Sequence, residues 1–140
     1  MKSKVYFIRN ITSDNVIKIY EAMGKKLPGK VAVKVHSGED GNQNFLRPEF
    51  LKPMIDYVKG TVVECNTAYD GARKTTEDHT KLMKKHGWSN LFDIDILDGE
   101  GNDFVLDIPK GKIIKKDYVG SHIKNYDSCL VLSHFKGHPM

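Results

Sequence analysis

The stretch KVAVKVHSGEDGNQNFLRPEF, residues 30–50, holds the pattern that decides the fold. Valines alternate with other residues over 31–35, which predicts a β-strand, and this alternation indicates a strand that is not fully central in its sheet. A polar loop rich in Gly and Asn follows. Pro48 can occupy the first position of a helix, whereas Pro53 would kink that helix or make it begin later.

The same order of strand, loop and helix recurs along the chain. Further strands are predicted at residues 4–9, 60–65, 92–97 and 128–133, and further helices at 13–27 and 75–86. Strands that alternate with helices favour a parallel sheet with right-handed crossovers. The predicted fold class is therefore α/β, with three layers and a mainly parallel sheet flanked by helices. Turn residues near residues 98–118 interrupt this order and predict a β insertion.

The composition fits one globular domain. The 140 residues are 39% hydrophobic and 29% charged, and a chain of this length buries about two-thirds of its unfolded surface. No apolar run approaches the ~20 residues of a membrane span, and the N-terminus lacks a signal-peptide core. We therefore expect residues 1–140 to form a single α/β domain in the cytoplasm, with no membrane partner.

Charge and cysteine content narrow the possible partners and chemistry. The net charge is +4, and few aromatic residues accompany the lysine-rich stretch 110–116, which argues against a nucleic-acid partner. Cys65 and Cys129 are too few for a disulfide framework. Buried reduced thiols are the expected state, and a reactive thiolate at Cys65 is the alternative.

Polar loops follow three of the predicted strands. Ligands of open parallel sheets bind at the carboxyl ends of the strands, so these loops should meet at one edge. An imidazole there could act as a base, and a cationic side chain could hold an anion. The candidate ligand-binding residues are His36, Ser37, Gly38, Glu39, Arg47, Asn66, Tyr69, His134 and Lys136.

Three histidines form a candidate metal site. His36 and His134 each follow an apolar strand, and His138 could join them as a third ligand. Capping of backbone groups by the same side chains is the alternative. The loop after residue 36 contains neither GxGxxG nor GxxxxGK[ST], so no dinucleotide or P-loop fingerprint is present.

Three longer stretches resemble a known family. They are VAVKVHSGEDGNQNFLRPEF (31–50), VVECNTAYDGARKTTEDH (62–79) and LVLSHFKGHPM (130–140). They are similar to the uncharacterised iron-sulfur-centre proteins, a family classed as domain of unknown function 362. The resemblance implies a [4Fe-4S] cluster, but the C-x2-C-x2-C-x3-C run that would bind it is absent from this chain. It also implies that residues 1–140 are the N-terminal part of a longer architecture.

The expected function follows from these observations. The chain should be the N-terminal ligand- or cofactor-binding portion of an iron-sulfur or redox-type protein, inactive alone. Its partner would be a missing C-terminal domain or a second copy. Two alternatives remain open: a metal-dependent enzyme using His36 and His134, and a non-enzymatic module that binds an acidic partner.

Overall fold

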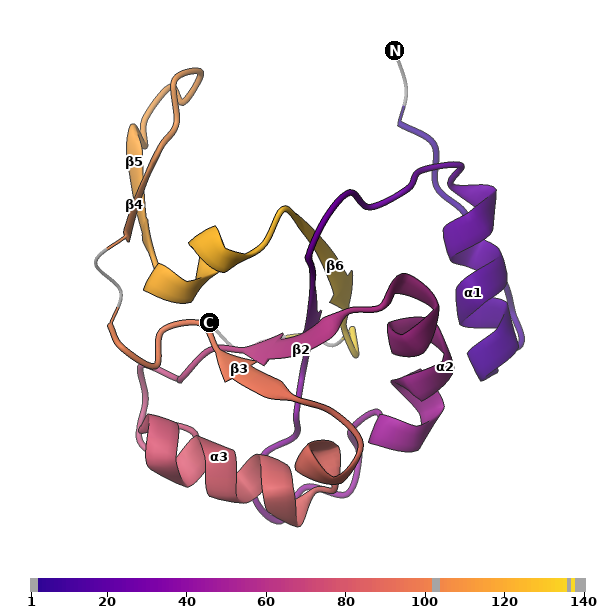
Figure 1. Cartoon of the computed structure of the whole chain (residues 1–140), viewed down its shortest axis with the longest axis horizontal. Coiled ribbons are helices and arrows are strands. Elements are labelled where there is room, and N and C mark those ends of the chain that lie inside the picture. Colours follow the sequence, from indigo (N-terminus) through magenta and orange to yellow (C-terminus); the bar gives the residue numbers. More distant parts are fainter. Residues whose placement is uncertain (1–2, 102–103, 136, 138–140) are drawn as a thin grey trace.

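A four-stranded parallel sheet forms the centre of the computed structural model, which describes residues 3–101, 104–135 and 137 (Figure 1). Its strands, in their order across the sheet, are β3 (Ile94–Ile96), β2 (Thr61–Glu64), β1 (Val31–Val35) and β6 (Ser128–Leu132). All three pairings between neighbours are parallel. The predicted mainly parallel sheet is therefore confirmed.

Strand β1 is more central than its alternating pattern suggested. Val33 is paired with Val62 of β2 on one side and with Leu130 of β6 on the other. Every residue of β1 except Lys34 is buried. The expectation of a less central strand was wrong because Lys34 has an acidic partner on β2, described below, and so needs no solvent-facing position.

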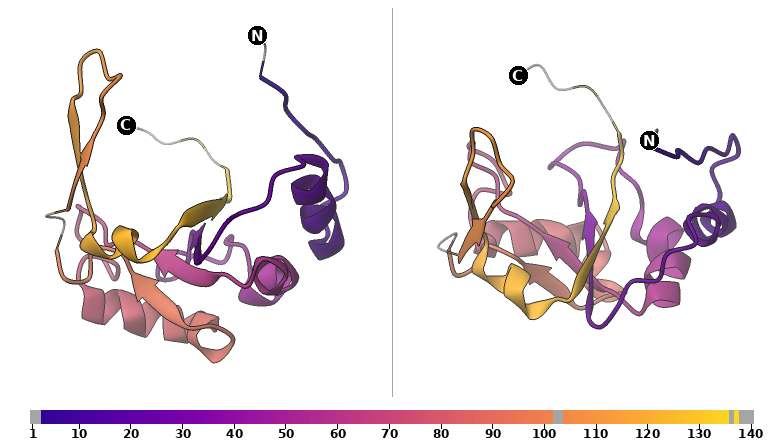
Figure 2. Two further views of the ribbon diagram at one scale, coloured as in Figure 1. Left: turned by 45° about the horizontal axis from the view of Figure 1, so that its top comes forward. Right: turned by 90° about the horizontal axis from the view of Figure 1, so that it is seen from above.

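The sheet lies between two layers of different kinds (Figure 2). Helices α2 (Pro48–Val58) and α3 (Thr76–Lys85) cover one face, and α1 (Ser13–Ala22) packs against α2. The 3-10 helix η2 (Ser121–Asn125) covers part of the opposite face through Ile123. This arrangement confirms the predicted three-layer α/β fold class.

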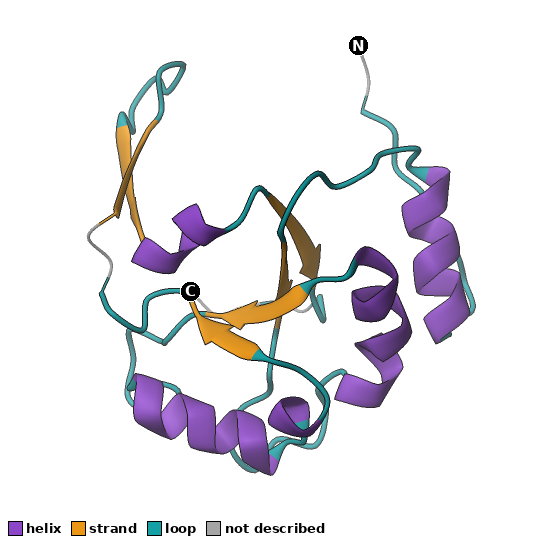
Figure 3. Cartoon of the chain, in the orientation of Figure 1, coloured by secondary structure: helices purple, strands orange, loops and turns teal. Residues whose placement is uncertain are grey.

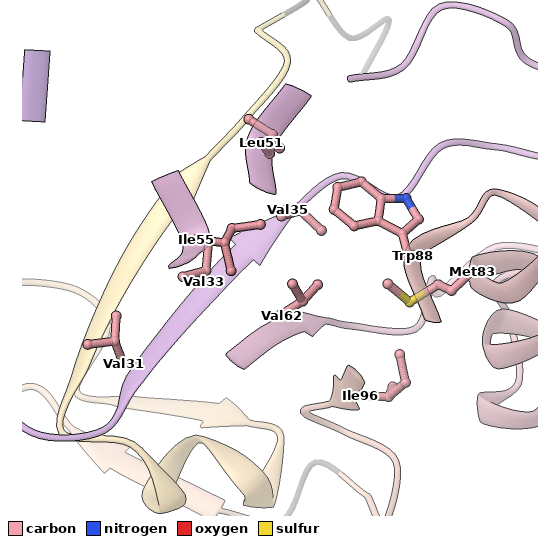
Figure 4. Close-up of a cluster of buried hydrophobic side chains, with 9 residues drawn as sticks. All are labelled: Val31, Val33, Val35, Leu51, Ile55, Val62, Met83, Trp88 and Ile96. Carbon is pink, nitrogen blue, oxygen red and sulfur yellow. The ribbon is translucent and has the colours of Figure 1, made fainter. Parts of the chain in front are cut away.

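The main core lies between the sheet and its helices (Figure 4). Val33 of β1 and Val62 of β2 are fully buried there, and Ile55 of α2 and Met83 of α3 pack over them. Trp88, which opens the 3-10 helix η1 (Trp88–Asn90), is also fully buried. Its indole N–H donates to the carbonyl of Ser37 at 3.2 Å, so the core also fixes the loop after β1.

Helix boundaries follow from local chemistry. Helix α2 begins at Pro48 and continues through Pro53, so the alternative of a later start was wrong. Thr75 caps α3, because its hydroxyl oxygen accepts a hydrogen bond from the backbone N–H of Asp78 at 3.2 Å. Helix α1 is shorter than predicted and is followed by Gly24 at φ +62°, a left-handed conformation typical of helix ends.

The predicted β insertion is present as a hairpin of β4 (Phe104–Asp107) and β5 (Lys116–Val119). It projects away from the parallel sheet (Figure 3). Residues 4–9, predicted as the first strand, have no regular secondary structure. That prediction was wrong because apolar alternation makes a strand only where a neighbouring strand is available.

None of the helices in the described ranges is long and apolar enough to cross a membrane.

Substitution of Ile55 tests the assignment of the core. Ile55→Ala should lower the free energy of unfolding by about 2–5 kcal/mol, because the cavity would lie between α2 and the sheet. Ile113→Ala, at a hairpin position that is 93% exposed, should change it by less than about 0.5 kcal/mol. Urea denaturation followed by tryptophan fluorescence measures both values. Equal effects of the two substitutions would contradict the assignment.

Candidate functional site

The loops after β1, β2 and β6 leave the same edge of the sheet, because these three strands are parallel neighbours. Val35 at the end of β1 is paired with Leu132 at the end of β6. The loops that start at His36 and Ser133 therefore begin at the same level. This edge is where an open α/β sheet usually binds its ligand.

A buried carboxylate organises this edge. Glu64, the last residue of β2, is only 1% exposed. Its Oε2 lies 2.5 Å from Nζ of Lys34, and its Oε1 accepts a 2.7 Å hydrogen bond from the backbone N–H of Ser37. Nη1 of Arg73 lies 3.5 Å from the same Oε1. A charge buried this deeply needs such partners, so Glu64 joins β1, β2 and the loop that follows each of them.

Arg73 extends this cluster to two of the predicted residues. Its Nη2 pairs with Glu39 and lies 3.2 Å from the hydroxyl of Tyr69. The Tyr69 hydroxyl in turn donates to Glu39 at 3.0 Å. Glu39 and Tyr69, which belong to different loops, are therefore brought together by Arg73. We call Lys34, Glu39, Glu64, Tyr69 and Arg73 the ion-pair cluster.

A chain of hydrogen bonds links Ser37 to the loop after β2. Oγ of Ser37 lies 3.1 Å from Nε2 of His79, and Nδ1 of His79 lies 3.3 Å from Oδ1 of Asn66. The amide oxygen of Asn66 can only accept, so Nδ1–H donates to it and Nε2 accepts from the Ser37 hydroxyl. The order of groups is that of a nucleophile, a base and an orienting residue. However, Ser37 and His79 are both fully buried, so these contacts hold the two loops together and present no nucleophile to solvent.

The ion-pair cluster keeps its carboxylates charged. Burial would raise the pKa of Glu64, but the charge and hydrogen bond of Lys34, the Ser37 N–H and Arg73 together lower it below its ordinary value. Burial also opposes ionisation of Glu39, and its contacts with Arg73 and Tyr69 lower its pKa in the same way. Burial lowers the pKa of His79, so its imidazole is neutral at pH 7.

A cleft of about 650 Å³ opens at the carboxyl ends of β2 and β3, and Asn66 is part of its wall. This volume lies within the range of small-molecule sites. Asp98 fixes the adjoining backbone, because its Oδ1 accepts a 2.9 Å hydrogen bond from the N–H of Asn66. The lining residues are Cys65, Asn66, Thr67, Ala68, Lys74, Leu97, Asp98, Gly101, Tyr118, Val119, Gly120 and Ile123. The hairpin strand β5 and η2 thus form the wall opposite the loop after β2.

The two cysteines do not supply a cluster site. Both are free, but neither is buried as predicted: Cys65 is half-buried, and Cys129 is exposed on the edge strand β6. Burial raises the pKa of Cys65, which disfavours a thiolate there, so the reactive-thiolate alternative gains no support. Two cysteines provide at most two of the four thiolates of a [4Fe-4S] cluster. The residues of this chain therefore do not fit that cofactor.

The other predicted site residues are spread along the edge. Nδ1 of His36 accepts a 3.0 Å hydrogen bond from the N–H of Gly38. Arg47 stacks over the ring of Phe45 and donates to the carbonyl of Gln43 at 2.8 Å, so it stabilises the loop before α2. His134 lines an apolar groove beside β6 instead of the cleft.

The predicted metal site gains no support from the described residues. Within residues 3–101, 104–135 and 137, no three His, Cys, Asp or Glu side chains are grouped so that they could hold a metal ion. Two predicted site residues, Lys136 and His138, lie outside the described ranges. A site that uses His138 therefore remains a prediction.

Sequence reasoning missed the residues that organise the edge: Lys34, Glu64, Arg73 and His79. A signal was present for two of them, because Lys34 and Glu64 interrupt apolar strands with opposite charges. Neighbouring parallel strands can pair such charges only in the right register, and here Lys34 lies beside Val63, next to Glu64. No sequence signal indicated Arg73, since its position depends on the path of a long loop.

The fold and this edge define an α/β protein with a ligand-sized cleft at the carboxyl ends of its parallel strands. The model of the family described as Domain of unknown function (DUF362) matches residues 31–140. The chain therefore belongs to this family, as the resemblance predicted. No curated protein and no solved structure matches the chain. The iron-sulfur association implied by the resemblance remains a prediction.

The neutral state of His79 makes stability depend on pH. Unfolding exposes His79, which then takes up a proton as the pH falls through about 6.5, while the native state resists this because its pKa is lower. The free energy of unfolding should thus fall by up to about 1.4 kcal/mol per pH unit below pH 6.5. In His79→Gln the part of this pH dependence that comes from His79 should be lost.

Urea denaturation between about pH 5.5 and 7.5 measures the effect as a difference between the two proteins. A hydrogen bond to Asp95 raises the pKa of His122, which acts in the opposite direction but is present in both proteins. The exposed His134→Gln serves as a matched control and should keep the wild-type slope. A slope unchanged in His79→Gln would contradict the buried neutral imidazole.

Proposed function

We propose that this chain is the ligand-binding portion of a redox-type protein and that it binds a small organic anion in the cleft beside Asn66. The observation that carries the proposal is the position of the cleft. It lies at the carboxyl ends of β2 and β3, where parallel α/β sheets bind their ligands, and its volume of about 650 Å³ suits a small molecule. The redox part of the proposal rests on the family resemblance.

The lining suggests the chemistry of the ligand. Leu97, Val119 and Ile123 give the cleft an apolar surface on which a ring or alkyl body can pack. Lys74 provides a cation at the wall, where it pairs with the exposed Asp70. Exchange of this exposed ion pair for a ligand carboxylate or phosphate costs little, because such pairs are weak in water.

The network behind the cleft would hold the binding wall in place. Asn66 donates from Nδ2 to the hydroxyl of Thr76 at 2.9 Å while its Oδ1 accepts from His79. Both polar ends of its side chain are therefore used by the protein. In this proposal Asn66 positions the backbone of the loop, and the ligand contacts backbone groups and Lys74. The chain binds the ligand, and the chemical step needs groups supplied by another domain.

Titration with benzoate and benzyl alcohol tests the proposal. Benzoate should shift the amide NMR signals of Asn66, Thr67 and Asp98, because an aromatic body fits the apolar surface and the carboxylate meets Lys74. Lys74→Gln should weaken benzoate binding by up to about fivefold, the effect of an exposed charge pair worth up to about 1 kcal/mol. Benzyl alcohol, which has no charge, should bind both proteins equally.

Lys81→Gln is the matched control, since Lys81 is an equally solvent-accessible lysine on α3 that does not line the cleft. It should leave benzoate binding unchanged. Shifts confined to residues outside the cleft, or no shifts at all with either probe, would refute the cleft as the binding site. Equal weakening by the Lys74 and Lys81 variants would show non-specific attraction to positive charge.

A further inference from the structure

Strand β6 presents an unpaired edge. It is the last strand of the sheet, and among the described residues it pairs only with β1. Val131, on the sheet face opposite α2, is 61% exposed, and residues 128–133 carry no charge. Proteins normally protect such an edge with charges, with Pro or with a covering segment, because it is a template for another strand.

The N-terminal segment has the complementary property. Residues 3–9, here called the arm, have the apolar alternation of a strand but no regular structure. Val5 and Phe7 are 89% and 82% exposed, so the arm leaves two large apolar side chains in water. Within the part of the single chain that the structure describes, the arm therefore has the pattern of a strand without a pairing partner and exposes apolar side chains without a covering surface.

A groove of about 550 Å³ connects the two elements. Ile11, just after the arm, and Val16 of α1 line one part, and residues 131–135 of β6 and its continuation line another. Phe135, at this end of the groove, is 93% exposed. The remaining lining residues, Leu46, Phe50 and Leu51, belong to α2 and the loop before it. An extended apolar segment alongside β6 would therefore bury side chains as well as pair its backbone.

The single chain does not use its own arm for this purpose. In the left view of Figure 2 the arm runs on the outer side of α1, apart from β6. A tethered segment has an effective concentration on the order of millimolar, so it would outcompete a segment from solution if it could reach. The carbonyl of Asn10, next to the arm, accepts a 2.8 Å hydrogen bond from Nδ2 of Asn15, which ties this end of the arm to the first turn of α1.

We propose that β6 is a strand-addition site for the arm of a second copy of this chain. Each copy places its arm on β6 of the other, which gives a two-fold symmetric dimer with two equivalent strand pairings. Val5 and Phe7 then become buried beside Val131 and the other apolar side chains of β6. This inference is independent of the proposed ligand, because the cleft lies at the other end of the sheet, between β2 and β3.

Disulfide trapping tests the contact, because Cys129 on β6 is naturally exposed. Val5→Cys and Phe7→Cys, each combined with Cys65→Ala, cover two registers of the arm. Oxidised glutathione should link one of them to Cys129 of the other copy and give a covalent dimer on a non-reducing gel. The further change Cys129→Ser should abolish that dimer. Ile113→Cys, at an exposed hairpin position, measures how much covalent dimer forms through random collisions.

Sedimentation of the unmodified chain supplies a second measurement. It should show a monomer–dimer equilibrium, and Phe7→Asp or Val131→Lys should raise the dissociation constant at least about tenfold, because each would bring a charge into the apolar contact. Ile113→Asp should leave the equilibrium unchanged.

Three outcomes would overturn the proposal. A disulfide between Val5→Cys or Phe7→Cys and Cys129 within one chain would show that the arm covers its own β6. If the chain is a monomer at every concentration, and if the yield of covalent dimer is no greater than for Ile113→Cys, the arm of a second copy does not bind β6. A dimer unaffected by Phe7→Asp and Val131→Lys would place the interface elsewhere.

Discussion

The buried carboxylate of Glu64 is the constraint on which the carboxyl edge of the sheet depends. A charge at the end of a core strand must be matched within hydrogen-bond distance, and its partners come from three places. Lys34 supplies a cation from β1, Ser37 an N–H from the next loop, and Arg73 a guanidinium from the loop after β2. The requirement to satisfy one side chain thus fixes the paths of two long polar loops.

The consequences of this constraint reach the cleft. Ser37 bonds to Glu64 through its backbone and to His79 through its hydroxyl, and His79 bonds to Asn66 in the cleft wall. The inner end of this network, at Glu64, Ser37 and His79, is buried, whereas its outer end opens to solvent beside Lys74. A buried hydrogen-bond network behind an accessible surface is what a binding site needs if its loops are to keep one shape.

Much of the fold could be predicted from the sequence, because the strands and helices carry their own periodicity. The alternating valines of β1, the Pro48 start of α2 and the Thr75 cap of α3 are local signals. Arg73 and His79 carry no such signal, since their roles depend on contacts between distant segments. The arm failed as a predicted strand for the same reason: its pattern is correct, but pairing requires a neighbour that this chain does not place beside it.

The side-chain titration of Glu64 tests the central claim most directly. Carbon-13 NMR of the Glu64 carboxyl group, assigned by comparison with Glu64→Gln, would follow its ionisation as the pH is lowered. The account predicts a pKa below the ordinary value of 4.5 despite almost complete burial, because Lys34, Ser37 and Arg73 stabilise the charge. A pKa above 4.5 would mean that burial dominates, that the ion-pair cluster is not formed, and that the loops are held by something else.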